Sequence, residues 1–517
     1  MGFMDQLRNE MNNEKQLTEN GAVGFRTTGK ELLDLNFAVA SLRKASDMDI
    51  INKFIRAYFE DKVVAVKWLF YARDAREGLG ERRLFRVVME EFANQEHKAA
   101  KELLKLVPEY GRWDDLWCLL DTDLVDDVVA VVKTQLTEDF ENMSNGKSIS
   151  LCAKWMPSAN ASSEQTKKYA KIFCKKFGDT PRNYRKTLSK MREYIDVVER
   201  KMSSNEWVDI NYEAVPSRAN LIYNNAFLRN DEDRRRLYLG ALEKGEAKIN
   251  ASVLFPHDIV HKYGYAYNRV DAALEGMWKA LPDTVKGCGN TIVVADGSGS
   301  MQCTVDYGSG VTALEVANSL AIYFAERSSG EFKDKYITFS ERPQLVDLSQ
   351  GKNLREKLAI ARMHNEVANT NIEAVFDLIL STAVNNRMAQ EDIPANILIV
   401  SDMEFDACAT TNTAGRSTGW GWSGPRVRPT ETLFETIAKK YAAHGYKLPR
   451  LVFWNVNSRT GTIPVKNNDL GVALVSGFSV NIVKMVMSNK TNPYECLLET
   501  LNSERYQAVE DAVKDIL

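Results

Sequence analysis

The fold of the second half of the chain is decided by residues 291–300, which read Thr-Ile-Val-Val-Ala-Asp-Gly-Ser-Gly-Ser. The apolar run at the start of this stretch predicts a buried parallel strand. Asp296, Ser298 and Ser300 follow on a turn that two glycines loosen. Open α/β sheets place their ligands here, at the carboxyl end of a strand. Since all three side chains offer oxygen, the stretch predicts a site for a hard cation such as Mg²⁺.

Apolar strands and helices alternate from about residue 290 onward. The pattern predicts strands at 291–295, 335–339, 396–401 and 450–455, and helices at 313–327, 372–385 and 433–443. This alternation is typical of a doubly wound, mostly parallel sheet of the Rossmann-like kind. A loop rich in Thr, Gly, Ser, Trp and Pro interrupts the pattern at 409–429.

Two later residues are expected beside the opening stretch. Thr370 stands at the start of the helix predicted at 372–385, and Asp402 directly follows the strand predicted at 396–401. The carboxyl ends of parallel strands meet at one edge of a sheet, so we expect a five-residue metal site there: Asp296, Ser298, Ser300, Thr370 and Asp402. It would hold Mg²⁺, or another divalent cation such as Mn²⁺ or Ca²⁺, with one position open to an outside acidic group. The alternative is a turn that binds no metal.

Further polar and aromatic residues flank this predicted site. Glu404 and Asp406 follow Asp402 at alternate positions and are expected to face solvent; the alternative is that they strengthen the negative field around the metal. Trp420 and Trp422 belong to the loop at 409–429, which emerges near the same edge of the sheet. An exposed aromatic pair beside an open metal position would suit a protein partner. The alternative is that both indole rings tuck onto the domain.

The first half of the chain reads as a succession of amphipathic helices. Apolar residues recur at three- and four-residue spacing in segments 49–59, 62–75, 82–92, 99–106, 163–177, 184–201 and 231–244. Strand-like alternation is scarce, so we expect a stack of antiparallel helix pairs. The predicted organisation is therefore a helical domain at 1–285, an α/β domain at 286–490 and a helical tail at 491–517.

A dense group of cations lies in the helical half, although the net charge of the whole chain is only −3. Its members are Lys167, Lys168, Lys171, Lys175, Lys176, Arg182, Arg185, Lys186, Lys190 and Arg192. Such a group can neutralise several phosphates of a nucleic acid. Tyr169 and Tyr184 are candidates to stack on unpaired bases. The alternative is an ordinary solvated helix face.

The remaining composition excludes several classes of protein. Seven scattered cysteines without a C-x-x-C pair favour a reducing, cytoplasmic compartment over disulfides or structural zinc. No apolar run approaches the length of a membrane span, and the first residues lack the apolar core of a secretory signal. No histidine is placed to activate Ser298, and the His-x-x-x-His spacing of His257 and His261 lacks a third zinc ligand. A hydrolase is therefore the least favoured option.

Several motifs resemble a known combination of domains. Asp-x-Ser-x-Ser, a later Thr and a later Asp resemble the metal-ion-dependent adhesion site (MIDAS) of von Willebrand factor A domains. In the helical half, Thr-Glu-Asn-Gly-Ala at 18–22, Ala-Arg-Asp-Ala-Arg at 72–76 and Tyr-Gly-Arg-Trp-Asp-Asp-Leu at 110–116 resemble the Ro ribonucleoprotein autoantigen and its relatives. The resemblance is strongest to a Ro-like family of plants, fungi, bacteria and phages.

The Ro resemblance implies a monomeric ring of HEAT-like helical repeats of the TROVE type, followed by the A domain. It also implies a non-enzymatic scaffold or chaperone that binds small structured, non-coding or misfolded RNA, here through the cation group. The alternative function is a metal-dependent protein-interaction module that captures an acidic partner, for example in a phage particle or host complex. We expect no membrane association and a cytoplasmic location, or a virion-associated one if the protein is phage-encoded.

Overall fold

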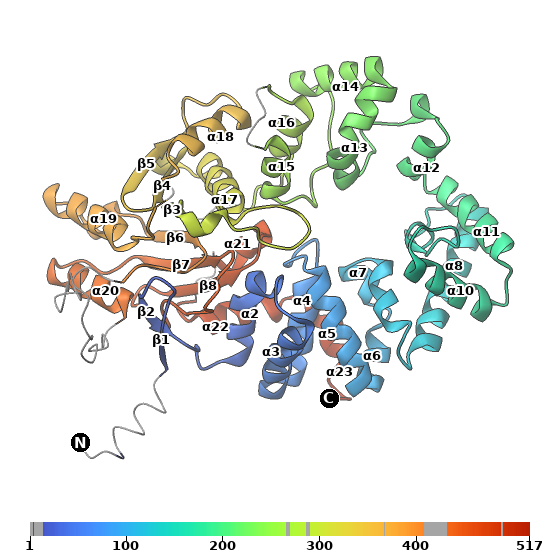
Figure 1. Cartoon of the computed structure of the whole chain (residues 1–517), viewed down its shortest axis with the longest axis horizontal. Helices are drawn as coiled ribbons and strands as arrows, with labels where there is room; N and C mark the ends of the chain where they lie inside the picture. The colour runs from blue at the N-terminus through green and yellow to red at the C-terminus, as the bar shows by residue number, and fades with distance from the viewer. Residues whose placement is uncertain are drawn as a thin grey trace, which may run out of the picture. The chain divides into compact units, whose positions relative to one another are not determined.

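A computed structural model describes residues 4, 14–264, 269–285, 290–366, 368–407, 432–486 and 490–517 (Figure 1). The predicted fold class is confirmed: helices dominate the first half, and a mostly parallel, six-stranded sheet follows. The chain forms two compact units, each built from separate stretches. The α/β unit comprises the stretch ending at Ser46 together with Phe255–Arg269 and Asp283–Thr500. The helical unit comprises Asp47–Leu254, Val270–Pro282 and Leu501–Leu517.

The sheet of the α/β unit has the strand order β5-β4-β3-β6-β7-β8. Its strands are β3 (Thr291–Asp296), β4 (Lys335–Phe339), β5 (Pro343–Asp347), β6 (Asn396–Ser401), β7 (Arg450–Asn455) and β8 (Val472–Ser476). All neighbours run parallel except β5, which pairs antiparallel with β4 at one edge. The four predicted strands are present, while β5 and β8 are additional. Strand β3 is buried along its whole length, which is why its sequence is a continuous apolar run.

Helices of the α/β unit pack against this sheet or against each other. They are α2 (Glu31–Leu42), α15 (Pro256–Tyr263), α17 (Ala313–Arg327), α18 (Leu354–Met363), α19 (Glu373–Asn385), α20 (Leu433–Ala443) and α21 (Val483–Val486), followed by α22 (Pro493–Leu501). α17 contacts β3, β4 and β6, and every residue from Ala313 to Ala325 is buried. α2 contacts β7 and β8, where the Ala40 amide donates to Ser476 Oγ at 2.9 Å.

A small antiparallel ribbon precedes α2. It consists of β1 (Lys15–Leu17) and β2 (Val23–Phe25), with Leu17 paired to Val23. The ribbon also bridges to the α/β unit at two points, Gly21 to Asp406 and Phe25 to Ile463. The N-terminal segment therefore belongs structurally to the α/β unit, although the predicted metal-site residues follow it by hundreds of positions.

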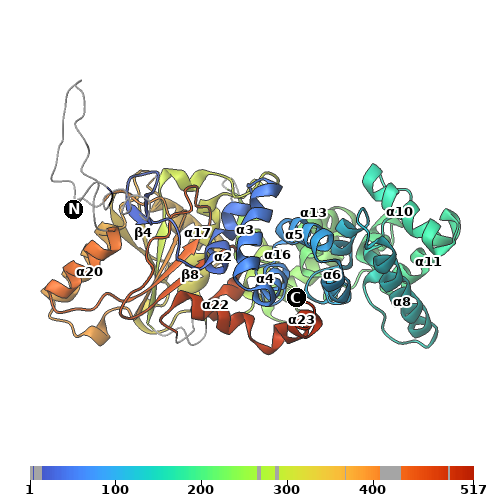
Figure 2. The ribbon, with the colours of Figure 1, turned by 90° about the horizontal axis from the view of Figure 1, so that it is seen from below.

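The helical unit is a succession of packed helices (Figures 1 and 2). Its first part contains α3 (Asp47–Glu60), α4 (Lys62–Arg73), α5 (Arg82–Gln95), α6 (His97–Leu103), α7 (Val107–Tyr110), the 3₁₀ helix η1 (Trp113–Leu119), α8 (Val125–Ser144) and α9 (Cys152–Trp155). The second part contains α10 (Glu164–Phe177), α11 (Pro181–Tyr194), α12 (Val198–Ser203), η2 (Trp207–Asp209), α13 (Ser217–Asn230), α14 (Glu232–Lys244) and α16 (Ala272–Lys279). Several consecutive helices contact each other, as in α3 with α4 and α4 with α5.

One predicted helix of this unit is wrong in its extent. The pattern predicted a single helix over 184–201, but α11 ends at Tyr194 and α12 begins at Val198. Asp196 in the gap has a φ of 60°, which lies in the left-handed region. A helix cannot continue through this conformation, and Asp tolerates it better than most residues.

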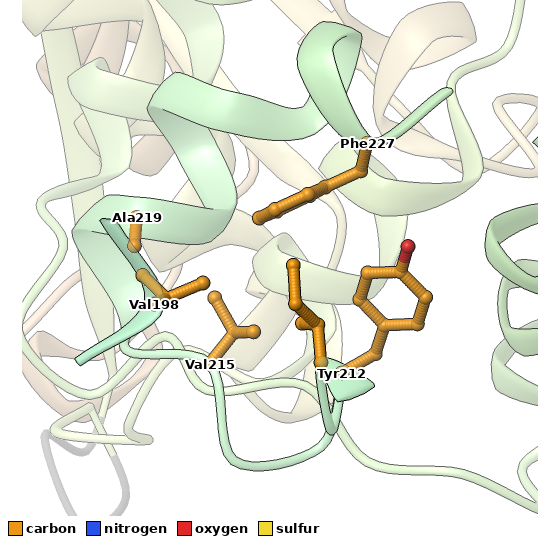
Figure 3. Packing of buried hydrophobic residues seen from close by; sticks show 6 residues of the cluster. Val198, Tyr212, Val215, Ala219 and Phe227 are labelled. Atoms are coloured by element: carbon orange, nitrogen blue, oxygen red, sulfur yellow. The ribbon is translucent and has the colours of Figure 1, made fainter. Parts of the chain in front are cut away.

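A separate apolar cluster holds the middle of the helical unit together (Figure 3). Its buried members are Val198, Ile210, Tyr212, Val215, Ala219 and Phe227. Arg235 is fully buried beside it, with its guanidinium 4.8 Å from the Tyr212 ring centre and 5.1 Å from that of Phe227. Asn224 Oδ1 accepts a hydrogen bond from Arg235 Nη2 at 2.9 Å. Aromatic faces and an amide oxygen thus stabilise a buried cation.

The motif at 110–116 builds part of the core of the helical unit. Asp115 is fully buried and accepts hydrogen bonds from Arg73 Nε at 2.7 Å and from Arg86 Nε at 2.8 Å. Gly111 is required beside it, because a Cβ there would lie 2.5 Å from Asp115 Oδ2. Trp117 is buried, whereas Trp113 is only half-buried.

The C-terminal residues close the same core. The segment contains η8 (Glu504–Tyr506) and α23 (Gln507–Val513), and α23 packs on α4 and α6. Arg505 Nε donates to Asp74 Oδ2 at 2.8 Å, and the Tyr506 hydroxyl reaches the same oxygen at 3.3 Å. The motif at 72–76 therefore anchors the end of the chain. Across the part of the chain that is described, no helix has the length and apolarity needed to cross a membrane.

Candidate metal centre and basic surface

Two neighbouring parallel strands bring the carboxylates of the predicted metal site together. β3 ends at Asp296, and Asp402 directly follows the end of β6. Ser401 Oγ donates to Asp296 Oδ2 at 2.6 Å, which links the two strand ends. On the turn after β3, the hydroxyl oxygens of Ser298 and Ser300 lie 3.1 Å apart. Four of the five expected donors therefore occupy one edge of the sheet.

Backbone hydrogen bonds hold Thr370 against the same edge. The amide of Gly299 donates to the carbonyl of Ala368 at 3.2 Å, which ties the segment before α19 to the turn after β3. On the other side, Thr370 and Asp406 exchange two bonds: the Asp406 amide donates to the Thr370 carbonyl at 3.0 Å, and the Thr370 amide donates to Asp406 Oδ2 at 3.0 Å. The structure thus places all five predicted donors on three connected loops.

Burial makes the two carboxylates unfavourable as free anions. Burial, with the nearby charge of Asp402, raises the pKa of Asp296 to about 7. The pKa of Asp402 is also raised, chiefly by burial, although the Ser300 hydroxyl and the Glu404 amide act in the opposite direction. Two buried carboxyl groups with raised pKa values repel each other when both are ionised. A bound cation would relieve both the repulsion and the loss of hydration.

The donor set fits a divalent cation. Asp402 Oδ2 is buried and has no hydrogen-bond partner among the described residues. Its nearest cation is Arg459, whose Nη2 lies 3.6 Å away, beyond hydrogen-bond distance. Two carboxylates and three hydroxyls match the all-oxygen coordination of Mg²⁺. No cluster of three or more His, Cys, Asp or Glu exists within the described ranges, so a metal here would depend on the hydroxyls.

Glu404 corrects the expectation that the residues after Asp402 face solvent. Its side chain is fully buried, and Oε1 accepts hydrogen bonds from the Arg459 amide at 2.8 Å and the Thr460 amide at 2.9 Å. Oε2 accepts from the Glu19 amide at 2.9 Å. Amide donors from two distant segments replace water around this carboxylate, which explains its burial. Asp406, which binds the amide of Thr370, is half-buried and so also departs from the expectation.

The N-terminal motif at 18–22 contacts residues of the candidate metal centre, which the sequence did not predict. Asn20 Nδ2 donates to the Glu404 carbonyl at 2.6 Å and lies 3.3 Å from Thr370 Oγ. Glu19 forms an ion pair with Arg459 at 2.8 Å. The motif itself was visible in the sequence, but nothing there connects it with loops near residues 370, 404 and 459.

Four of the ten predicted RNA-binding cations are paired with an acid or hydrogen-bonded to another segment, while Arg185 Nε donates only to the Pro181 carbonyl of its own helix at 3.3 Å. Lys167 pairs with Glu164 at 2.7 Å, Lys168 pairs with Asp121 at 2.5 Å, and Lys176 pairs with Asp126. The fourth, Arg192, stabilises the packing of α11 on a neighbouring segment. It donates to the carbonyls of Ala153 and Met156, each at 2.8 Å, and so joins α11 to the α9 region.

The other six cations form what we call the basic surface: Lys171, Lys175, Arg182, Arg185, Lys186 and Lys190. All six are exposed, and within the described ranges none has an acidic side chain at ion-pair distance. They lie on α10 and α11, two consecutive helices that contact each other and α8 (Figure 2). A shallow groove of about 510 Å³ runs along α10, lined in part by Lys171 and Lys175. The basic surface therefore offers free positive charge to an outside anion.

The aromatic residues predicted to stack on bases or to contact a partner have different outcomes. Tyr184 is only 3% exposed and donates its hydroxyl hydrogen to the Pro157 carbonyl at 2.8 Å, so it cannot stack on a base. The expectation for Tyr184 is thus wrong, because the ring fills the core side of α11. Tyr169 is half-buried. Trp420 and Trp422, the predicted partner contacts, lie outside the described residues, and their role stays a prediction.

Comparisons with known proteins place the chain in a family. One family model, described as a domain of unknown function (DUF7788), matches residues 290–515, and a second, a domain of unknown function (DUF2828), matches 165–290. The chain belongs to the same family as "Uncharacterized protein L728" of Acanthamoeba polyphaga mimivirus, to which it is 30% identical over 94% of this chain and 86% of that protein.

Among solved structures, the chain is similar to the Deinococcus radiodurans RO (RSR) protein. The TM-score is 0.44 and the sequence identity 14%, over 90% of this chain and 99% of the other.

Proposed function

We propose that the protein is a non-enzymatic RNA-binding scaffold, whose helical unit contacts RNA phosphates through the basic surface. The observation that carries this proposal is the presence of six exposed cations on α10 and α11 without acidic partners in the described structure. The neighbouring Lys167, Lys168 and Lys176 are paired with acids, so the free positive charge of these two helices comes from the six residues of the basic surface. The motif resemblance to Ro proteins points to the same ligand, a small structured or misfolded RNA with a single-stranded end.

The spacing of the cations suits a phosphate backbone. Arg182, Lys186 and Lys190 follow each other at four-residue intervals, which places them along one face of α11. Each phosphate contact releases condensed counterions, so six contacts would give a salt dependence with a slope of about −4 for single-stranded RNA. The net charge of −3 for the whole chain supplies no further attraction. Binding should therefore be local, moderate in affinity and strongly weakened by salt.

The test is a gel-shift or anisotropy titration with a structured RNA that carries a single-stranded end. Reversal of charge in the triple variant Arg185→Glu, Lys186→Glu, Lys190→Glu should abolish binding at low salt. A matched control reverses Lys53, Arg56 and Lys98, which are exposed on α3 and α6 and change the net charge equally. Equal loss of affinity in both variants, or no binding by the wild type at low salt, would refute the proposal.

A second function is favoured by the metal centre: capture of an acidic protein partner by a divalent cation in a von Willebrand factor A-type domain. Its support is the convergence of five oxygen donors with the unpartnered oxygen Oδ2 of Asp402. Mn²⁺ should bind with one-to-one stoichiometry, and Asp402→Asn should remove that binding while the fold persists. Absence of Mn²⁺ binding at millimolar concentration would exclude this function and leave the RNA proposal untouched.

Catalysis is not part of the proposal. Ser298 shares a hydrogen bond with Ser300, and the carboxyl group of Asp296 accepts a hydrogen bond from Ser401. No hydrogen bond joins a histidine to Ser298 or Ser300 in the described ranges. An activated nucleophile needs such a partner. The hydroxyls are better suited as neutral metal ligands.

A further inference from the structure

Arg459 stands between the metal centre and the N-terminal segment. Its Nη2 nitrogen is 3.6 Å from Asp402 Oδ2 and 2.8 Å from the carboxylate of Glu19. The arginine side chain is 39% exposed and that of Glu19 53% exposed, whereas Asp402 is buried. The same guanidinium nitrogen therefore lies close to the outer carboxylate of Glu19 and farther from Asp402, a candidate metal ligand.

One buried carboxylate fixes the positions of both outer partners. Glu404 Oε1 accepts the amide hydrogen of Arg459 at 2.8 Å, and Oε2 accepts that of Glu19 at 2.9 Å. Because Glu404 is fully buried and lies two residues after Asp402, it anchors both backbones to the loop that carries the metal ligand. An ordinary surface ion pair has no such support, and its geometry is correspondingly loose. The backbone positions of Arg459 and Glu19 are thus fixed by buried hydrogen bonds to Glu404.

A divalent cation and the guanidinium of Arg459 would compete for the same carboxylate oxygen, Asp402 Oδ2. Asp402 Oδ2 is the unpartnered atom that a metal would take, and Arg459 is the cation closest to it. Two cations on one carboxylate oxygen repel each other, most strongly in a partly desolvated site. Glu19 offers the guanidinium an alternative carboxylate without requiring the backbone of Arg459 to move.

We propose that Arg459 is a built-in competitor of the divalent cation at Asp402, and that Glu19 takes up Arg459 when the metal binds. This inference rests on the proposed metal site. It implies that metal binding strengthens the docking of the N-terminal segment, because the full charge of Arg459 then pairs with Glu19. Coupling of this kind is reciprocal, so loss of Glu19 must weaken the metal. Asn20, which contacts Thr370, provides a second link between the segment and the site.

The test is Mn²⁺ titration of four proteins by calorimetry: wild type, Arg459→Gln, Glu19→Gln and the double variant. Arg459→Gln should tighten Mn²⁺ binding by roughly tenfold, as expected for removal of one nearby, partly screened charge. Glu19→Gln should weaken Mn²⁺ binding several-fold, because Arg459 then lacks its outer carboxylate and stays beside Asp402. In the double variant the effect of Glu19→Gln should vanish, because Glu19 acts through Arg459.

The outcomes separate this inference from the metal site itself. If the wild type binds Mn²⁺ and Arg459→Gln leaves the affinity unchanged or lowers it, the inference is overturned and the metal site stands. The inference is also overturned if Glu19→Gln weakens Mn²⁺ binding equally in the wild type and in Arg459→Gln. Such a result would mean that Glu19 acts on the metal through its own negative charge and not through Arg459. If no variant binds Mn²⁺, the metal site and the inference fail together.

A second readout does not depend on affinity. Saturating Mn²⁺ should slow hydrogen exchange of the amides at 18–22 in the wild type but not in Arg459→Gln. Arg459→Lys serves as the conservative control, because it keeps the charge and should retain most of the metal-dependent protection. Metal-dependent protection of equal size in the wild type and in Arg459→Gln would contradict the coupling.

Discussion

Arg73 donates a hydrogen bond to Asp115 at 2.7 Å, and both side chains are almost completely buried. The pair joins α4 to the 3₁₀ helix η1, and Arg86 of α5 binds the other carboxylate oxygen at 2.8 Å. The carboxylate of Asp115 thus joins α4, α5 and η1. Residues at 72–76 and 110–116, which carry the resemblance to Ro proteins, therefore stabilise the helical unit.

Replacement of Asp115 by Asn should destabilise the helical unit by about 3–5 kcal/mol, the usual penalty for leaving buried cations without their partner. Urea unfolding followed by circular dichroism measures the change. Asp126→Asn is the control, because Asp126 is 73% exposed and its ion pair with Lys176 lies on the surface. A change for Asp115→Asn as small as that of the control would show that the buried pair contributes little.

The same carboxylate gives a pH dependence of stability. Burial tends to raise the pKa of Asp115, but Arg73 and Arg86 outweigh burial, so the net pKa lies below the ordinary value. Because the folded pKa is lowered, the stabilisation is complete above the ordinary value of about 3.9 and is lost as pH falls through the folded pKa. The wild type should therefore lose more stability than Asp115→Asn below pH ~4, as measured by urea midpoints at several pH values.

Gly111→Ala should be strongly destabilising for a steric reason. The new Cβ would lie 2.5 Å from Asp115 Oδ2 and 2.8 Å from Arg73 Nε, so the buried ion pair would have to shift. Gly240→Ala on α14 is the matched control, since a Cβ there meets nothing within 4 Å and alanine favours a helix by about 0.5–1 kcal/mol. Thermal unfolding should lower the midpoint of the first variant and leave or raise that of the second. Similar midpoints would show that the pair adapts.

Lys186 and Arg192 should separate RNA binding from folding. Lys186 is exposed and unpaired within the described residues, so Lys186→Ala should weaken RNA binding and change stability by less than ~0.5 kcal/mol. Arg192 donates to the carbonyls of Ala153 and Met156, so Arg192→Ala should cost about 1–3 kcal/mol of stability and affect RNA little. Paired RNA titrations and urea unfolding test both. The reverse pattern would place the RNA-binding surface on the α9 side of α11.

The fold could be predicted where local patterns determine it. The apolar run of β3 and the order of strands and helices suffice to place Asp296 and Asp402 at one edge, because neighbouring parallel strands end on the same side. A signal for Tyr184 was also present: Tyr184, Leu188 and Met191 recur at helical spacing, and all three are buried. The helical period should therefore have assigned Tyr184 to the core.

The surroundings of the candidate metal centre depend on contacts between distant segments, which no local sequence pattern predicts. Glu404 reads as a surface residue in sequence, and it is buried because amides of Glu19, Arg459 and Thr460 converge on it. The edge strand β5 was missed for a different reason. It is short, begins with a proline and is mostly not buried, so its sequence lacks the apolar run of the central strands.

Metal binding should depend on pH through the two buried carboxyl groups. Since the pKa of Asp296 is raised to about 7, the metal-free protein holds a proton that a divalent cation must displace. Mn²⁺ affinity should therefore rise with pH and level off above pH ~7, and binding at pH 6 should release a proton. Calorimetry in buffers of different ionisation enthalpy counts that proton. A pH-independent affinity with no proton release would mean that Asp296 is already ionised.

Stability of the metal-free protein should follow the opposite trend. A carboxyl group whose folded pKa is raised destabilises the folded state as pH rises from the ordinary value of about 3.9 to the folded one. Asp296→Asn cannot ionise, so it should be more stable than the metal-free wild type at pH 8 and differ little at pH 5. Mn²⁺ should raise the unfolding temperature of the wild type at pH 8 and leave that of the variant unchanged. If the variant is the less stable protein at pH 8 without metal, the hydrogen bond from Ser401 to Asp296 outweighs the cost of burying the charge and the repulsion from Asp402.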